Sequence, residues 1–148
     1  MNLLKKTLTA SLITLSICSS ISFSSQQTES SWFASDKHPM FVGELENSEF
    51  LIFTTSPEII CSEFGLLVQS EQPVSELKLS LNDQSDYRGY EIIEFAKDLY
   101  GFILDDPEIS AMKNGSELWV KTDQYESKVS LNGFGDALDQ AWYNCITK

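Results

Sequence analysis

Two cysteines constrain this chain of 148 residues more than any other feature. The chain has three cysteines, Cys18, Cys61 and Cys145, and the first of them lies in an apolar N-terminal stretch with the pattern of an export signal. Removal of that stretch leaves a single pair. A single cysteine pair in an exported domain most simply forms one disulfide. We therefore expect a Cys61–Cys145 disulfide that joins the end of the chain to its middle.

The N-terminal stretch has the features of a signal peptide. Lys5 and Lys6 precede an apolar segment from Leu8 to Ile17, and small residues suit cleavage near Ser24. This segment is too short and too rich in Ser and Thr to span a membrane well. We expect residues 1–24 to be removed, and the remaining protein to be periplasmic or secreted, with no membrane insertion.

A lipoprotein is the alternative interpretation of the same stretch. Leu15-Ser16-Ile17-Cys18 resembles a bacterial lipobox, in which the cysteine becomes the lipidated first residue. The residue before that cysteine is normally small, whereas here it is Ile17. Ordinary cleavage is therefore favoured over lipidation.

The chain that follows the signal has the length of one domain. Residues 25–38 begin with SQQTESSWFASD, which is polar and rich in Ser, so they predict a flexible lead-in. Residues 39–148 are expected to form a single globular domain. Trp32 and Phe33 fall in the lead-in, either as exposed side chains or as aromatics that dock on a partner or on a sheet edge.

Most of the domain has the pattern of short antiparallel strands. The strands expected from apolar alternation and turn residues are 40–45, 50–54, 59–68, 74–81, 118–121 and 128–131. Residues 90–104 fit either a helical stripe or two strands joined at 96–98, and their β-branched and aromatic side chains favour the strands. The expected fold class is therefore mainly β, an antiparallel β-sandwich-like domain.

Two helices complete the expected fold. Asp106-Pro107-Glu108 has the sequence of a helix start and Asn114-Gly115 that of a stop, which predicts a short helix over 107–113. Residues 133–146 predict a C-terminal helix with one apolar face. The residues on this face are Leu138, Ala141, Trp142 and Cys145. Docking of the face on the sheet would bring Cys145 to Cys61, which we expect on a strand.

The chain is strongly acidic. It has 10 Lys and Arg against 22 Asp and Glu, a net charge of −12, and its acids are spread along the sequence. Such a surface repels phosphate backbones and argues against a nucleic-acid partner. It attracts a cationic protein partner and accelerates the encounter. The same charge also serves solubility alone, which requires no partner.

The residues that common catalytic sites require are sparse. His38 is the only histidine and lies in the expected lead-in, which argues against a Ser-His-Asp or Cys-His site. Cys61 and Cys145 lack CxxC spacing, which argues against redox catalysis and zinc. Capping or solvation explains the neighbouring acids, and the 82–86 loop lacks the Gly and terminal Glu of an EF-hand. We expect no catalytic residue, no metal and no cofactor.

Several aromatic residues are further candidates for a binding face. Tyr87, Tyr90 and Tyr100 fall around the ambiguous strands, whereas Trp119 and Trp142 are expected in the core. Tyrosine and tryptophan are enriched at interfaces because one end of the side chain is apolar and the other is polar. The spacing of these residues does not single out one surface.

The C-terminal third resembles a group of small secreted bacterial domains. Residues 109–120 (ISAMKNGSELWV) are followed by 128–134 (KVSLNGF), then Ala137-Leu138 and the closing Cys145. This order is similar to the invasion-associated locus B family and to disulfide-bonded accessory proteins of type VI secretion. The resemblance implies a β-sandwich-like sheet with a packed helix and no enzymatic activity. This chain departs from the locus B pattern in its two mature cysteines and its more acidic surface, so an invasion role is not carried over.

These features predict a non-enzymatic periplasmic or secreted module that binds a protein partner. The acidic surface suits a cationic partner, and an inhibitor or immunity protein against a cationic toxin or lysozyme is a sharper form of this hypothesis. Two alternatives stay open. One is a carboxylate-based hydrolase of envelope glycans, which requires two acids facing one cleft. The other is a structural accessory of an envelope or secretion machine.

Overall fold

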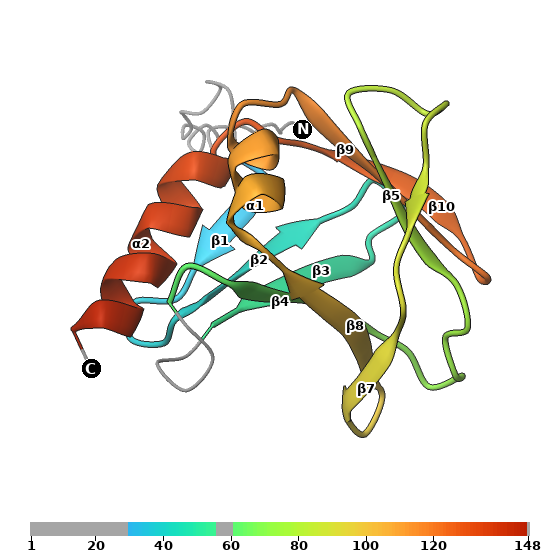
Figure 1. The fold of residues 1–148 in the computed structure, drawn as a ribbon, viewed down its shortest axis with the longest axis horizontal. Coiled ribbons are helices and arrows are strands. Elements are labelled where there is room, and N and C mark those ends of the chain that lie inside the picture. Colours follow the sequence, from blue (N-terminus) through green and yellow to red (C-terminus); the bar gives the residue numbers. More distant parts are fainter. Residues whose placement is uncertain (1–29, 56–60, 148) are drawn as a thin grey trace, which may run out of the picture.

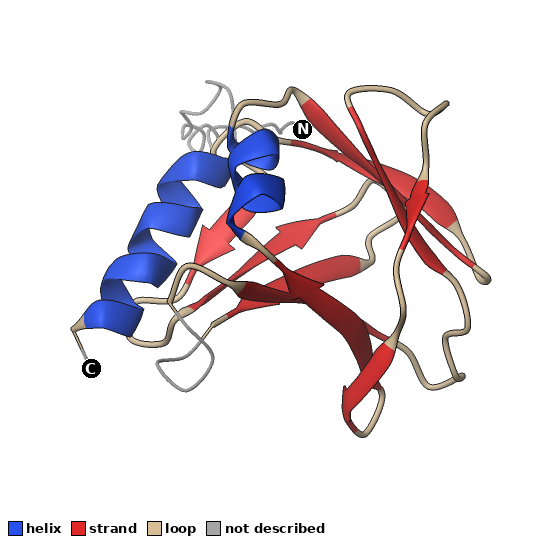
Figure 2. Cartoon of the chain, viewed as in Figure 1, coloured by secondary structure: helices blue, strands red, loops and turns tan. Residues whose placement is uncertain are grey.

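Residues 30–55 and 61–147 are described by the computed structural model, in which ten strands form two antiparallel sheets beside two helices (Figures 1 and 2). Sheet A has the strand order β1-β2-β3-β4-β8-β7, and sheet B has the order β10-β9-β5-β6. The expected mainly β, sandwich-like fold is confirmed. The strands of sheet A are β1 (Trp32–Ala34), β2 (Met40–Glu44), β3 (Phe50–Thr54), β4 (Phe64–Gln69), β7 (Ile93–Ala96) and β8 (Leu99–Leu104). Those of sheet B are β5 (Leu77–Leu81), β6 (Arg88–Gly89), β9 (Glu117–Thr122) and β10 (Glu126–Ser130).

Side-chain alternation gives sheet A an inner and an outer face. Phe41 and Phe53 are fully buried on the inner face, whereas Val42 and Ile52 are only partly buried on the outer face. The inner side chains join those of sheet B in one hydrophobic core. The two sheets are therefore held together by apolar side chains from which water is excluded.

Strand β1 corrects the expected flexible lead-in. Residues 32–34 pair with β2, and the Trp32 side chain is only 5% exposed. The rings that meet it edge-on are those of Phe41, Phe53 and Phe134. The lead-in expectation over 25–38 is wrong for residues 30–38, because burial of an indole outweighs the polar composition of its neighbours.

The boundaries of the expected strands are close to those observed except for β4, which begins at Phe64 where the expected strand spans 59–68, and for β5. Residues 93–96 and 99–104 form β7 and β8, so the two-strand interpretation of 90–104 is correct. Strand β5 begins at Leu77 and not at Val74, because the backbone N–H and hydroxyl of Ser75 both donate to the Asp123 carboxylate. A side chain that binds backbone groups in this way competes with the sheet ladder.

Helix α1 (Asp106–Lys113) confirms the expected short helix and corrects its cap. The N-cap is Asp105, which accepts from the Glu108 N–H at 3.2 Å, while Glu108 Oε1 accepts from the Asp105 N–H at 3.1 Å. This reciprocal pair is a capping box, and Pro107 lies in the first turn. The helix therefore begins one residue before the expected start, directly after β8.

Helix α2 (Phe134–Ile146) lies along β1 and β2 on the inner side of sheet A (Figure 1). Its buried face confirms Leu138, Ala141 and Cys145, but Trp142 is 46% exposed, so its expected core position is wrong. The buried stripe includes Asn144 instead. The Asn144 side-chain amide donates to the carbonyls of Ser35 and His38 at 2.9 and 3.0 Å, which orients the helix.

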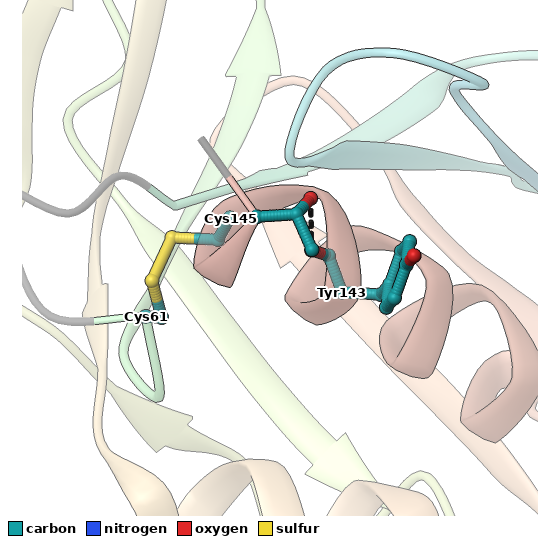
Figure 3. Close-up of a disulfide and its surroundings, with 4 residues drawn as sticks. Cys61, Tyr143 and Cys145 are labelled. Atoms are coloured by element: carbon teal, nitrogen blue, oxygen red, sulfur yellow. Dashed lines mark hydrogen bonds between the residues drawn. A yellow bond between two sulfur atoms is a disulfide. The ribbon is translucent and has the colours of Figure 1, made fainter.

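The expected disulfide is confirmed. Cys61 and Cys145 are bonded, with their Cα atoms 5.8 Å apart across a separation of 84 residues (Figure 3). Cys145 is buried in the last turn of α2, whereas Cys61 lies in a turn before β4 and not on a strand as expected. The bond thus fastens the end of α2 to the entry of a central strand of sheet A.

The expected signal peptide, the possible lipidation site at Cys18 and the first part of the lead-in lie outside the described residues. Within the part of the chain that the structure describes, no helix is both long and apolar enough to cross a membrane.

Candidate functional site

A pocket of about 370 Å³ opens between helix α1 and the inner face of sheet B. Its floor is apolar and is formed by Leu79, Leu81, Met112 and Leu118. Its rim is polar and includes Asp86, Tyr87, Arg88, Tyr90 and Glu108. An apolar floor with a few polar groups around the opening is the usual construction of a binding pocket. We call this site the α1 pocket.

Glu108 organises the rim of the α1 pocket. Its Oε2 accepts a 2.7 Å hydrogen bond from the Tyr90 hydroxyl and lies 3.7 Å from the Arg88 guanidinium. Its Oε1 accepts from the Asp105 N–H in the capping box. The Glu108 side chain is 16% exposed, against 71% for Arg88. Both oxygens of this carboxylate are therefore engaged within the protein.

Tyr90 links the pocket to sheet A. Its ring stacks on Phe102 of β8 with centroids 4.0 Å apart, and the Arg88 guanidinium lies 5.5 Å from the centroid of the Tyr90 ring. Burial raises the pKa of Tyr90, and the hydrogen bond to Glu108 raises it further. The hydroxyl therefore stays protonated and continues to donate at any physiological pH.

Tyr87 forms a second tyrosine–carboxylate pair beside the pocket. Its hydroxyl donates to Glu126 Oε2 at 2.6 Å, and Lys121 Nζ lies 5.8 Å from the centroid of its ring. The hydrogen bond from Tyr87 holds the pKa of Glu126 below its ordinary value, with a further bond from Gln84. This pair fixes the loop that carries Asp86 and Arg88 against sheet B.

Several acids of the described residues make local contacts or line the rim of a pocket. Asp83 accepts from the Ser85 hydroxyl and N–H in its own loop, and these bonds lower its pKa. Asp105 caps α1. Asp86 and Glu108 both line the α1 pocket, and other pockets of the described residues also hold two acids each, namely Asp36 with Asp136, Asp106 with Asp139, and Glu49 with Glu71. Within residues 30–55 and 61–147, no group of three or more potential ligand side chains gathers to hold a metal ion.

His38 and the aromatic candidates are also placed by the fold. The backbone carbonyl of His38 accepts from Asn144, so this residue serves to join the β1–β2 turn to α2. Trp32 belongs to the core, while Phe33 is 54% exposed. Tyr87 and Tyr90 reach the pocket, whereas Tyr100 does not line it. Tyr87 and Tyr90 are close in the sequence, but only the fold brings Glu108 of α1 to Tyr90.

No protein-family model, curated protein or solved structure matches this chain.

Proposed function

We propose that this protein is a non-enzymatic, periplasmic or secreted module that binds a cationic protein partner through the α1 pocket. The observation that carries the proposal is the apolar floor beneath a rim with net negative charge. Asp86 and Glu108 contribute two negative charges to that rim and Arg88 one positive charge. A lysine or arginine of the partner would place its apolar stem on the floor and its charged end at the rim.

The size of the pocket supports one inserted side chain. Its volume of about 370 Å³ exceeds that of a large amino-acid side chain and leaves room for water. Protein interfaces concentrate their binding energy in a few anchor residues that fill such pockets, among which arginine is enriched. The α1 pocket therefore suits an anchor residue better than a large extended substrate.

The distribution of charge supports a cationic partner. Several cationic side chains already contact acids of the same chain, as in the pairs Lys78–Glu76, Arg88–Glu108, Lys113–Asp139 and Lys128–Glu117. Because the sequence has 22 acids against 10 basic residues, many acids have no basic residue to match them. Their field accelerates association with a cationic protein, and salt weakens it.

The geometry of Glu108 favours binding over glycan hydrolysis. A carboxyl group that acts as acid or nucleophile must reach the substrate, whereas the two oxygens of Glu108 accept from Tyr90 and Asp105. A structural accessory of an envelope machine remains compatible with the same pocket. It differs from an inhibitor or immunity protein in the partner that the pocket holds.

Two adjacent positions on α1 give a matched test. Ala111 lines the pocket and Ser110 does not, although both are exposed. Ala111→Phe should fill the pocket, and Ser110→Phe adds the same ring outside it. The wild-type protein is used to capture a partner from an envelope extract, and mass spectrometry identifies that partner. Calorimetry then measures the affinity of the purified pair at low and high salt.

The proposal expects affinity to fall with salt and to weaken about tenfold in Ala111→Phe, with little change in Ser110→Phe. If both substitutions weakened the affinity equally, the pocket would not be part of the interface. An affinity that is the same at low and high salt would contradict the proposal that the partner is cationic. Release of reducing ends from envelope glycans that is lost in Glu108→Gln would favour the hydrolase instead.

A further inference from the structure

The outer face of sheet A carries an apolar row that crosses all six strands. In the strand register, Phe33 pairs with Val42, Val42 with Ile52, and Ile52 with Leu67. Leu67 in turn pairs with Gly101, which pairs with Ile93. Directly opposed residues of an antiparallel sheet point to the same face. We call these six residues the outer row.

The two ends of the outer row are exposed. Phe33 on β1 is 54% exposed and Ile93 on β7 is 50% exposed, and Phe50 on the same face is 47% exposed. Leu67 at the centre is buried, yet it is not part of the core that the two sheets share. The outer row is therefore an apolar surface separate from that core.

The described helices pack on the other side of sheet A. Phe134 of α2 contacts the inner rings Phe41 and Phe53, and α1 contributes Ile109 and Met112 to the core between the sheets. Apolar residues scattered singly over a surface are ordinary, but a contiguous apolar patch marks an interaction surface. The six residues are neighbours in the strand register, and because Leu67 and Gly101 are buried, the exposed apolar surface of the row is made by Phe33, the partly buried Val42 and Ile52, and Ile93.

The charges on sheet A restrict what covers this row. The six strands contain no Lys or Arg, and their acids are Glu44 and Glu94. Glu44 follows Val42 by two residues, which places it on the outer face beside the row. Lysines occur only in the adjoining turns, at Lys37 and Lys97. The face therefore combines apolar contact with negative charge.

The area of the face argues against a second copy as its occupant. Six strands at the usual spacing and length offer an area of roughly 400 Å². A stable protein dimer needs about 800 Å² from each partner. A dimer through this face would also bring together two chains with a net charge of −12 each.

We propose that the outer row binds a cationic amphipathic segment of a partner protein, with its apolar side on the row and its lysines or arginines near Glu44. Such a segment matches the face in area, in hydrophobicity and in charge. This contact uses the opposite side of sheet A from the α1 pocket, so it goes beyond the function proposed for that pocket.

A synthetic amphipathic 16-residue peptide of Leu and Lys serves as the probe, because a helix of about 16 residues is roughly 24 Å long, which equals the width of six strands. A peptide with Glu in place of Lys is its control. Phe33→Lys with Ile93→Lys disrupts the two ends of the row. The matched control is Tyr143→Lys with Ile146→Lys on α2, since these residues are 57% and 50% exposed. Both double variants change the net charge equally.

Fluorescence anisotropy should show binding of the Leu/Lys peptide that weakens about tenfold in the row variant and at most about twofold in the α2 variant. Phe33→Ser with Ile93→Ser should give the same loss, and thermal unfolding checks that each variant is folded. Equal weakening in the row and α2 variants, or equal binding of the Leu/Glu peptide, would overturn the proposal. If sedimentation showed that the wild type is a dimer and that the row variant is a monomer, the occupant of the outer row would be a second copy of the chain, and the proposal would be wrong. The α1-pocket variants leave this readout unchanged, so the two proposals fail separately.

Discussion

The indole N–H of Trp32 donates a 2.7 Å hydrogen bond to the backbone carbonyl of Ser130, across 98 residues of sequence. Trp32 belongs to the edge strand of sheet A, and Ser130 ends β10 of sheet B. The bond therefore joins an edge strand of sheet A, β1, to an edge strand of sheet B, β10. Gly43 lies beneath the indole ring, where a Cβ would be 2.6 Å from Trp32 Cη2. The absence of a side chain at this position makes room for the ring.

Trp32→Ala should lower the free energy of unfolding by about 3–5 kcal/mol, because it leaves a cavity among three phenylalanine rings. Trp32→Phe keeps much of the packing but leaves the Ser130 carbonyl without its donor, so about 1–3 kcal/mol should be lost. Phe33→Ala, at the next and exposed position, should cost less than about 1 kcal/mol. Urea unfolding followed by circular dichroism measures all three. An unchanged midpoint in Trp32→Ala would mean that β1 contributes nothing to the core.

Gly101 on β8 pairs with Leu67 on β4, and Gly65 on β4 pairs with Ile103 on β8. The two glycines differ sharply in the space available for a Cβ atom. A Cβ on Gly101 would lie 2.8 Å from the carbonyl carbon of Leu66 and 3.0 Å from the Cα of Leu67. A Cβ on Gly65 meets nothing closer than 3.7 Å. Gly101→Ala should therefore destabilise the fold by about 3 kcal/mol or more, and Gly65→Ala by less than about 1 kcal/mol. Thermal unfolding of both variants under identical conditions is the measurement, and similar melting temperatures would contradict the close approach of β4 to β8.

Loss of the disulfide should destabilise the domain without altering the α1 pocket. Cys61→Ser or Cys145→Ser releases a cross-link that spans 84 residues. The chain-entropy model gives a loss of at most about 4–5 kcal/mol. The pocket is built from α1, β5, β9 and the 86–90 segment that contains β6, and the bond joins none of these elements, so partner binding should persist in the folded fraction. Reductant should lower the urea midpoint of the wild type. It should leave unchanged the midpoint of a variant that carries both Cys61→Ser and Cys145→Ser. An equal response to reductant in both would contradict the bond.

The Tyr87–Glu126 pair should make stability depend on acidic pH. The hydrogen bond from Tyr87 lowers the pKa of Glu126 below its ordinary value of 4.5. A lowered pKa in the folded state stabilises the protein above pH 4.5, and this contribution is lost as the pH falls through the folded-state value. In Tyr87→Phe, the Glu126 pKa should move back toward 4.5, and the loss of stability on acidification should be smaller. Carboxyl NMR titration and urea unfolding at neutral and acidic pH measure the two effects. Tyr143→Phe, at an exposed tyrosine on α2, should change neither quantity.

The sequence predicted elements whose signals are local. Alternation of Leu77, Leu79 and Leu81 with polar residues gave β5, and the acid and proline at the start of α1 gave its N-terminus within one residue. The disulfide followed from counting cysteines, because only two lie outside the expected export signal. These predictions were correct because the signals for β5 and α1 lie in adjacent residues of the chain, and because two cysteines can pair in only one way.

The two wrong predictions, for Trp32 and Trp142, concern positions that are set by long-range contacts. The polar neighbours of Trp32 predict a flexible lead-in, whereas its burial depends on rings contributed by β2, β3 and α2. Helical spacing predicts Trp142 in the core, but Trp142 is exposed, and the buried side of α2 instead includes Asn144, which bonds to the β1–β2 turn. Contacts between distant parts of the chain override local composition in both cases.

By itself, the sequence determined the mainly β class, the acidic surface and the pair of cysteines that form the disulfide. Only the tertiary structure decided where function can reside. It brings Glu108 of α1 to Tyr90 beside β6, and it aligns Phe33 with Ile93 through the register of six strands. The physical reason is that a binding surface is a property of side chains from separate elements, whose relative positions are set by packing and strand pairing and not by any local pattern.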